Sequence, residues 1–155
     1  MRLPRPGALV YGTITVGALL AAESADRETY AETILAVAVA LVVYWLAHAY
    51  SDLTEHRLAH NQPLTLRGLG QTLARESMIV AGAAVPMLVL VIYGITGAHL
   101  TDAVNAAIWT SAGMIVAIEV LSGLRAHLSG PQLLVQAAMG TLCGLLVITL
   151  KLILH

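Results

Sequence analysis

Five apolar stretches, separated by shorter polar segments, constrain the fold of this chain more strongly than any other feature. They cover residues 7–22, 33–50, 78–97, 103–124 and 132–154. A helix needs about 20 apolar residues to cross the roughly 30 Å hydrocarbon core of a bilayer. Each stretch is close to that length, although the first is short and would need its flanking residues. The sequence therefore predicts an all-α, polytopic membrane protein with five transmembrane helices in one domain, residues 1–155.

The composition supports a membrane location and narrows the choice of partners. Only 11% of the residues are charged, whereas a soluble domain has about 25%. The net charge is −1 and no basic run occurs, so we expect the lipid bilayer and no nucleic acid as a partner. The single cysteine, Cys143, excludes an internal disulfide and a multi-cysteine metal site. The excess of Arg over Lys and the abundance of Ala, Leu, Val and Gly are typical of a GC-rich genome, so we expect a bacterial inner-membrane protein.

The longest polar stretch, residues 51–77, lies between the second and third spans. We expect the second helix to continue to about His60, to break at residues 61–63 and to restart near Thr65. Apolar and polar residues then alternate with helical spacing, with Leu66, Leu69, Leu73 and Ala74 on one face and Arg67, Gln71 and Arg75 on the other. This pattern predicts an interfacial amphipathic helix between the second and third spans.

The distribution of basic residues predicts the orientation, because Arg and Lys are enriched in cytoplasmic loops. With a cytoplasmic N-terminus, the inner side holds six of the eight basic residues, namely Arg2, Arg5, Arg57, Arg67, Arg75 and Arg125. Only Arg27 and Lys151 then face outward. We therefore expect the N-terminus to be cytoplasmic and the C-terminus to be outside.

Proline, glycine and capping residues predict how the spans bend and begin. Pro86 lies in the middle of the third span, where it should kink the helix and leave the Gly82 carbonyl without its usual donor. Residues 101–102 (Thr-Asp) are expected to cap the fourth span, and residues 130–131 (Gly-Pro) to open the fifth.

Gly140 and Gly144 form a GxxxG pattern in the fifth span. Such a pattern permits two helix backbones to approach closely and is compatible with a helix dimer. Five short helices also enclose too little volume for a pore of their own. We therefore expect a homo-oligomer, with any conducting path at its centre or between its subunits.

Titratable side chains gather toward the inner end of the second span. A series at intervals of four, which stacks on one helical face, consists of Tyr44, His48, Asp52, His56 and His60. Under the expected orientation, the start of the third span and the end of the fourth lie at the same depth. We therefore expect a cytoplasm-facing polar vestibule formed by His48, Asp52, Glu55, Glu76 and Glu119, in which His48 is the partner of Glu119.

Three interpretations of these residues stay open. The first is passage of protons or small cations along a path lined by His and carboxylates, which relay protons and attract cations. The second is a non-transporting scaffold or partner-binding subunit, in which His48 and Glu119 only join two helices. The third is a metal-dependent membrane enzyme, because a divalent metal such as Zn²⁺ suits the helical spacing of His48, Asp52, His56 and His60. No catalytic or nucleotide-binding motif accompanies that spacing, which favours a role other than catalysis.

Overall fold

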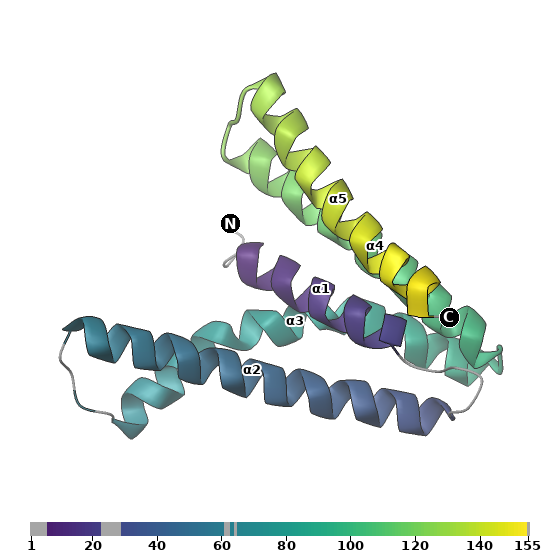
Figure 1. The fold of residues 1–155 in the computed structure, drawn as a ribbon, viewed down its shortest axis with the longest axis horizontal. Coiled ribbons are helices and arrows are strands. Elements are labelled where there is room, and N and C mark those ends of the chain that lie inside the picture. Colours follow the sequence, from purple (N-terminus) through teal and green to yellow (C-terminus); the bar gives the residue numbers. More distant parts are fainter. Residues whose placement is uncertain (1–5, 23–28, 61–62, 64, 155) are drawn as a thin grey trace.

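The computed structural model describes residues 6–22, 29–60, 63 and 65–154, and this part of the chain is helical apart from its turns (Figure 1). The helices are α1 (Pro6–Ala22), α2 (Tyr30–His60), α3 (Leu66–Thr96), α4 (Leu100–Arg125) and α5 (Gly130–Leu154). The described residues contain no strand. The predicted all-α class is therefore confirmed.

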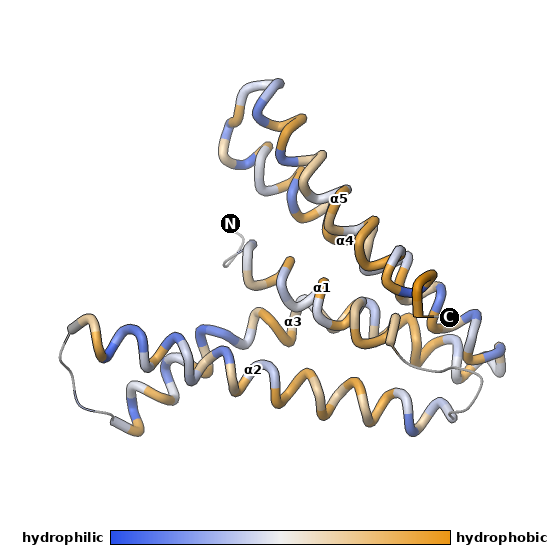
Figure 2. Tube along the Cα trace, viewed as in Figure 1, coloured by the Kyte–Doolittle hydropathy of each residue, from blue (hydrophilic) through white to orange (hydrophobic). Residues whose placement is uncertain are grey.

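Four of these helices, α2 to α5, are long and apolar enough to cross a membrane. Figure 2 shows hydrophobic residues along most of their length, with hydrophilic residues near the helix ends, both around the α2–α3 turn and at the α4–α5 turn. α1 has 17 residues, which corresponds to about 25 Å and is shorter than the hydrocarbon core. The helices fit a membrane protein, and a fifth span formed by α1 stays a prediction.

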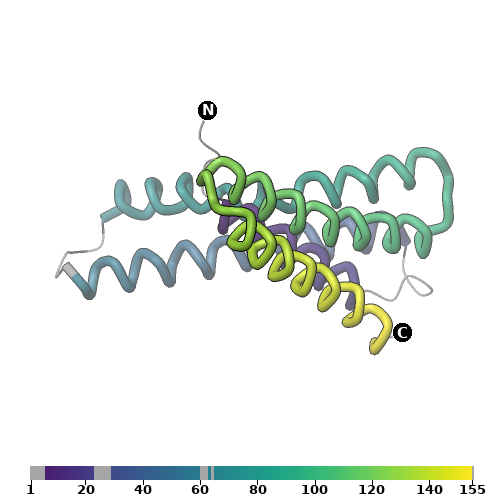
Figure 3. Tube along the Cα trace, turned by 90° about the horizontal axis from the view of Figure 1, so that it is seen from above, coloured from purple at the N-terminus to yellow at the C-terminus, as the bar shows by residue number. Residues whose placement is uncertain are grey.

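α1 occupies the centre of the bundle. It packs against each of the other four helices, and Figure 1 shows it between α2 and the α4–α5 hairpin. Figure 3, seen from above, shows the α4–α5 hairpin lying across α1. The core around it combines fully buried side chains from four helices, namely Val16, Leu20, Val37, Ile79, Leu90 and Val104. Because its neighbours cover it, α1 needs less contact with lipid than the longer helices do.

Glycines allow the backbones of α1 and α3 to touch. A Cβ atom added at Gly12 of α1 would collide with the carbonyl oxygen of Ile79. A Cβ atom added at Gly82 of α3 would collide in the same way with the carbonyl oxygen of Leu9. Any side chain at either position would push the two helices apart, so this contact requires glycine on both of them.

The carbonyl that Pro86 deprives of a donor receives one from α1. Pro86 has no N–H, so the Gly82 carbonyl four residues earlier lacks its helical partner. The hydroxyl of Thr13 lies 3.0 Å from this carbonyl oxygen and 2.9 Å from the carbonyl oxygen of Leu9. Thr13 is completely buried. The single hydroxyl hydrogen of Thr13 is thus shared between this carbonyl and that of Leu9, and α3 continues through Pro86 as one helix.

The ends of the α2–α3 connection lie where the sequence predicted them, and the expected break at residues 61–63 lies outside the described residues except for Pro63. α2 ends at His60, and Thr65 caps α3 by accepting the N–H of Gly68 at 3.1 Å. The expected interfacial helix is not separate, however, because α3 is continuous from Leu66 to Thr96. The amphipathic segment is therefore the first part of α3. Its position at a membrane surface stays a prediction.

The start of α5 agrees with the sequence prediction, whereas the start of α4 does not. α5 begins at Gly130 with Pro131 in its first turn, as expected. α4 begins at Leu100, and its N-cap is His99, which makes no side-chain capping bond. The predicted cap at residues 101–102 is therefore wrong by two to three residues. Asp102 still lies in the first turn, where a carboxylate is favoured by the helix dipole.

Candidate functional site

Polar side chains of α2 and α3 meet toward the end of the bundle that holds the α2–α3 turn. Nε2 of His48 lies 3.7 Å from Oε2 of Glu76. Arg75 donates from Nε to Oε1 of Glu76 at 3.3 Å, and from Nη2 to Oδ2 of Asp52. We refer to these four residues, His48, Asp52, Arg75 and Glu76, as the α2–α3 cluster. It joins the two helices through charged groups rather than through apolar packing.

Glu76 is the most deeply buried member of the α2–α3 cluster. Its side chain is 5% exposed, whereas that of His48 is 41% exposed. Removing a carboxylate from water is unfavourable unless hydrogen bonds and positive charges compensate. Arg75 and a protonated His48 supply such compensation.

Two tyrosines connect the α2–α3 cluster to α1. The hydroxyl of Tyr11 donates to the hydroxyl of Tyr44 at 2.5 Å. The Tyr11 ring centroid also lies 5.1 Å from the centroid of the His48 imidazole. Tyr44 and His48 are four residues apart and therefore share one face of α2. The imidazole is thus held between a tyrosine of α1 and a carboxylate of α3.

An open cavity of about 500 Å³ lies beside these side chains. Its lining residues come from α1, α2 and α3, namely Gly7, Ala8, Tyr11, His48, Asp52 and Glu76. A water molecule occupies about 30 Å³ in the liquid, so the cavity has room for several. His48 and Glu76 therefore both line a space that water can fill.

Glu119 lies outside the α2–α3 cluster. Its Oε2 accepts a hydrogen bond from Nε2 of Gln136 in α5 at 2.7 Å. α2 packs against α3 and α1, whereas the α4–α5 hairpin diverges from α2 (Figure 1). The partner of Glu119 is therefore Gln136 and not His48, and the pair joins α4 to α5.

The remaining predicted site residues on α2 are more exposed. Glu55 and His56 are exposed and line a shallow cavity next to Asp52. Among the residues whose side chains are described, no group of three His, Cys, Asp or Glu is arranged to hold a metal ion. Asp52 is engaged by Arg75, and the side chain of His60, the fourth predicted ligand, lies outside the described part.

Gly140 and Gly144 lie in the contact between α4 and α5. Both are buried, and a Cβ atom at Gly140 would come within 3.1 Å of Glu119 Cγ. One at Gly144 would come within 3.2 Å of the carbonyl oxygen of Ala112. The GxxxG pattern therefore serves helix packing within the chain, and a second copy would need another surface.

Two residues of the site were not among those predicted from the sequence. Arg75 was expected only on the polar face of a surface helix, although its position directly before Glu76 was an available signal for an ion pair. Tyr11 lies in an apolar stretch, where nothing in the local pattern indicates a contact with His48.

Comparison with known proteins adds no family to this geometry. No protein-family model matches the chain, and neither a curated protein nor a solved structure matches it. The function is therefore inferred from the site itself.

Proposed function

We propose that this protein binds and passes protons or small cations, with the α2–α3 cluster as its binding site and Glu76 as the central residue. The observation that carries the proposal is the 3.7 Å separation of His48 and Glu76 beside an open cavity. An imidazole next to a buried carboxylate can take up a proton, form an ion pair and release the proton again. Ionisable residues within membrane-spanning helices are functional candidates for this reason.

The proposed orientation places the α2–α3 cluster on the cytoplasmic side of a bacterial inner membrane. The end of α2, the start of α3 and the end of α4 carry Arg57, Arg67 and Arg125, whereas residues 97–99 between α3 and α4 contain no Arg or Lys. Single cysteines test this orientation in a Cys143→Ser background. A membrane-impermeant maleimide added to intact cells should label His99→Cys but not Ala126→Cys. Labelling of Ala126→Cys alone would reverse the orientation.

Passage across the whole membrane requires more than one chain in this proposal. Beyond Glu76, the side chains that α3 buries are apolar and include Ile79, Ala83 and Leu90. A proton or cation would not cross this dry core, so we place the rest of the path between subunits of a homo-oligomer. Mass photometry in a mild detergent should therefore give a mass above that of a monomer. A purely monomeric protein would contradict the interfacial path.

Flux into proteoliposomes tests the function. The wild-type protein should admit protons or small cations faster than protein-free vesicles do, under an imposed potassium diffusion potential. Glu76→Gln and His48→Gln should each reduce the flux to the protein-free level, because each removes one half of the pair. Glu32→Gln, which changes an exposed carboxylate at the other end of α2, should behave as the wild type. Equal flux in the wild type, Glu76→Gln and protein-free vesicles would overturn the proposal.

A further inference from the structure

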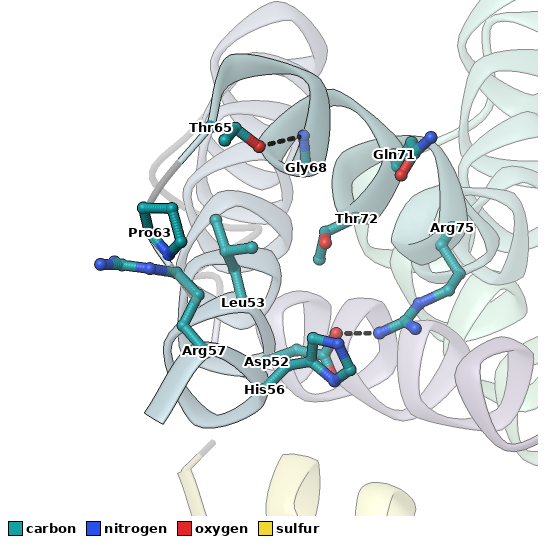
Figure 4. Close-up of a pocket in the computed structure, with 10 residues that line it drawn as sticks. All are labelled: Asp52, Leu53, His56, Arg57, Pro63, Thr65, Gly68, Gln71, Thr72 and Arg75. Atoms are coloured by element: carbon teal, nitrogen blue, oxygen red, sulfur yellow. Dashed lines mark hydrogen bonds and ion pairs between the residues drawn. The ribbon is translucent and has the colours of Figure 1, made fainter. Parts of the chain in front are cut away.

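A guanidinium group is bound to both carboxylates of the α2–α3 cluster. Arg75 donates from Nη2 to Oδ2 of Asp52 and from Nε to Oε1 of Glu76. Figure 4 shows the Arg75 side chain extended toward Asp52. The second oxygen of Glu76, Oε2, lies 3.7 Å from Nε2 of His48. Groups of the protein that are positive or can become so therefore face both oxygens of Glu76 and one oxygen of Asp52.

The charge of Arg75 disfavours a metal cation at this site. Arginine stays protonated in proteins, so its charge cannot be removed to admit another cation. A metal cation that reached the carboxylates would lie close to the guanidinium, and two positive charges repel each other more strongly beside a buried carboxylate than in water. Hard cations such as Ca²⁺ and Mg²⁺ also need several oxygen ligands at once, whereas Arg75 and His48 face both oxygens of Glu76.

A proton needs only one lone pair, and the imidazole of His48 offers one. The His48 side chain is 41% exposed and lines the cavity of about 500 Å³, so water can bring a proton to its ring. The proton forms an N–H bond with a ring nitrogen, and the same bond breaks when the proton returns to water. The charges match a single proton. With His48 neutral, the carboxylates of the α2–α3 cluster outnumber its guanidinium by one, and one proton on the imidazole balances them.

We infer that the species handled by the α2–α3 cluster is the proton, and that Arg75 is the residue that excludes metal cations. This inference rests on the proposed function, which allows both protons and small cations, and it narrows that function to the first of them. Arg75 acts by its charge, so a lysine at this position should preserve the selectivity and an uncharged residue should not.

Two arms of one proteoliposome assay separate protons from metal cations. Vesicles that contain K⁺ and a pH-sensitive dye are diluted into a buffer whose only cation is a large organic one. In the first arm valinomycin carries K⁺ outward, so the lumen acidifies faster than in protein-free vesicles only if the protein admits protons. In the second arm a protonophore replaces valinomycin, and the lumen acidifies only if the protein releases K⁺. The wild type should acidify the lumen in the first arm and match protein-free vesicles in the second, which is repeated with Na⁺ inside.

The outcomes of the two arms distinguish this inference from the proposed function. Acidification by the wild type in both arms, or in the second arm alone, would overturn proton selectivity. If Glu76→Gln then abolished that acidification, the proposed function would still stand. Acidification in neither arm would overturn the inference and the proposed function together.

Substitutions of Arg75 test how metal cations are excluded. Arg75→Gln should speed K⁺ release in the second arm about tenfold or more, because it removes the repelling charge. Arg75→Lys keeps a positive charge and should stay selective for protons. Arg67→Gln is the matched control, because it removes an exposed arginine earlier in α3, and it should behave as the wild type.

Melting temperatures show whether these variants are folded. A folded Arg75→Gln protein that still excludes K⁺ would show that Arg75 is not the selecting residue. If Arg75→Gln does not fold, the two arms with the wild type still decide whether the α2–α3 cluster selects protons, and Arg75→Lys decides whether a positive charge at this position is enough: K⁺ release by folded Arg75→Lys would overturn the role of the charge.

Discussion

Nε2 of His48 on α2 and Oε2 of Glu76 on α3 are 3.7 Å apart. At this separation the two side chains form an ion pair only when the imidazole carries a proton. In that state the pair should stabilise the contact between α2 and α3.

A double-mutant cycle of His48→Gln and Glu76→Gln should give a favourable coupling free energy. The His48 side chain is 41% exposed, so solvent screening limits this coupling to about 0.2–1 kcal/mol. Thermal unfolding of the four proteins in detergent measures it. The other titratable groups around His48, namely Tyr11, Tyr44, Asp52 and Arg75, stay unchanged throughout the cycle. A coupling free energy of zero would show that the two side chains do not interact.

Thr13→Val should destabilise the protein by about 1 kcal/mol, because it removes the donor to the Gly82 carbonyl. The loss should be smaller in a Pro86→Ala background, where residue 86 again offers its own N–H to that carbonyl. Melting temperatures in detergent give both values. Thr15→Val is the control, because the Thr15 hydroxyl donates to the Tyr11 carbonyl of its own helix. An identical loss with and without Pro86 would mean that Thr13 does not replace the missing donor.

Gly12→Ala and Gly113→Ala should have opposite effects. A Cβ atom at position 12 meets the Ile79 backbone, and such overpacking destabilises by about 1–3 kcal/mol or more where backbone must move. A Cβ atom at position 113 has no atom within 4 Å, so Gly113→Ala should gain up to about 1 kcal/mol from helix propensity. The melting temperature and the amount of protein recovered from membranes measure the stability of both variants. A Gly12→Ala protein that melts with the wild type would show that α1 and α3 are not in backbone contact.

Gln136→Leu should destabilise the α4–α5 hairpin by about 1–3 kcal/mol, because it removes the amide donor to the Glu119 carboxylate. Glu119→Gln should remain close to the wild type, since two amides can still hydrogen-bond. Combining Glu119→Leu with Gln136→Leu should recover much of the loss, because neither partly buried polar side chain then remains without its partner. These melting temperatures show whether Glu119 and Gln136 stabilise the fold as a pair. If Glu119→Gln keeps its stability but abolishes flux, the ion path includes α4.

The helices were predictable because the length and polarity of an apolar run are local properties of the sequence. The end of α2 at His60 and the start of α5 at Gly130 follow from adjacent polar, Pro and Gly residues. The break expected between the amphipathic segment and the third span is absent because residues 66–77 also favour a helix. Nothing at their junction interrupts it, and α3 is continuous.

The site was predictable only in part. The sequence predicts the depth of a residue in the membrane, but it does not predict which other helix lies beside that residue. His48, Glu76 and Glu119 were assigned to one depth, and the first two do lie together. Glu119 lies elsewhere because α1, which carries no charge pattern, packs between α2 and the α4–α5 hairpin. Arg75 was assigned to lipid headgroups, yet it lies against two carboxylates once α2 and α3 form a hairpin.

The bond between Thr13 and the Gly82 carbonyl also bears on how the chain is assembled. Until α1 lies alongside, α3 would enter the bilayer with a backbone oxygen that has no donor, and such a group costs several kcal/mol in hydrocarbon. The ribosome delivers α1 first, so we expect this helix to be retained at the insertion machinery until α3 emerges beside it. A chain translated without its first helix should insert poorly and be degraded by membrane proteases.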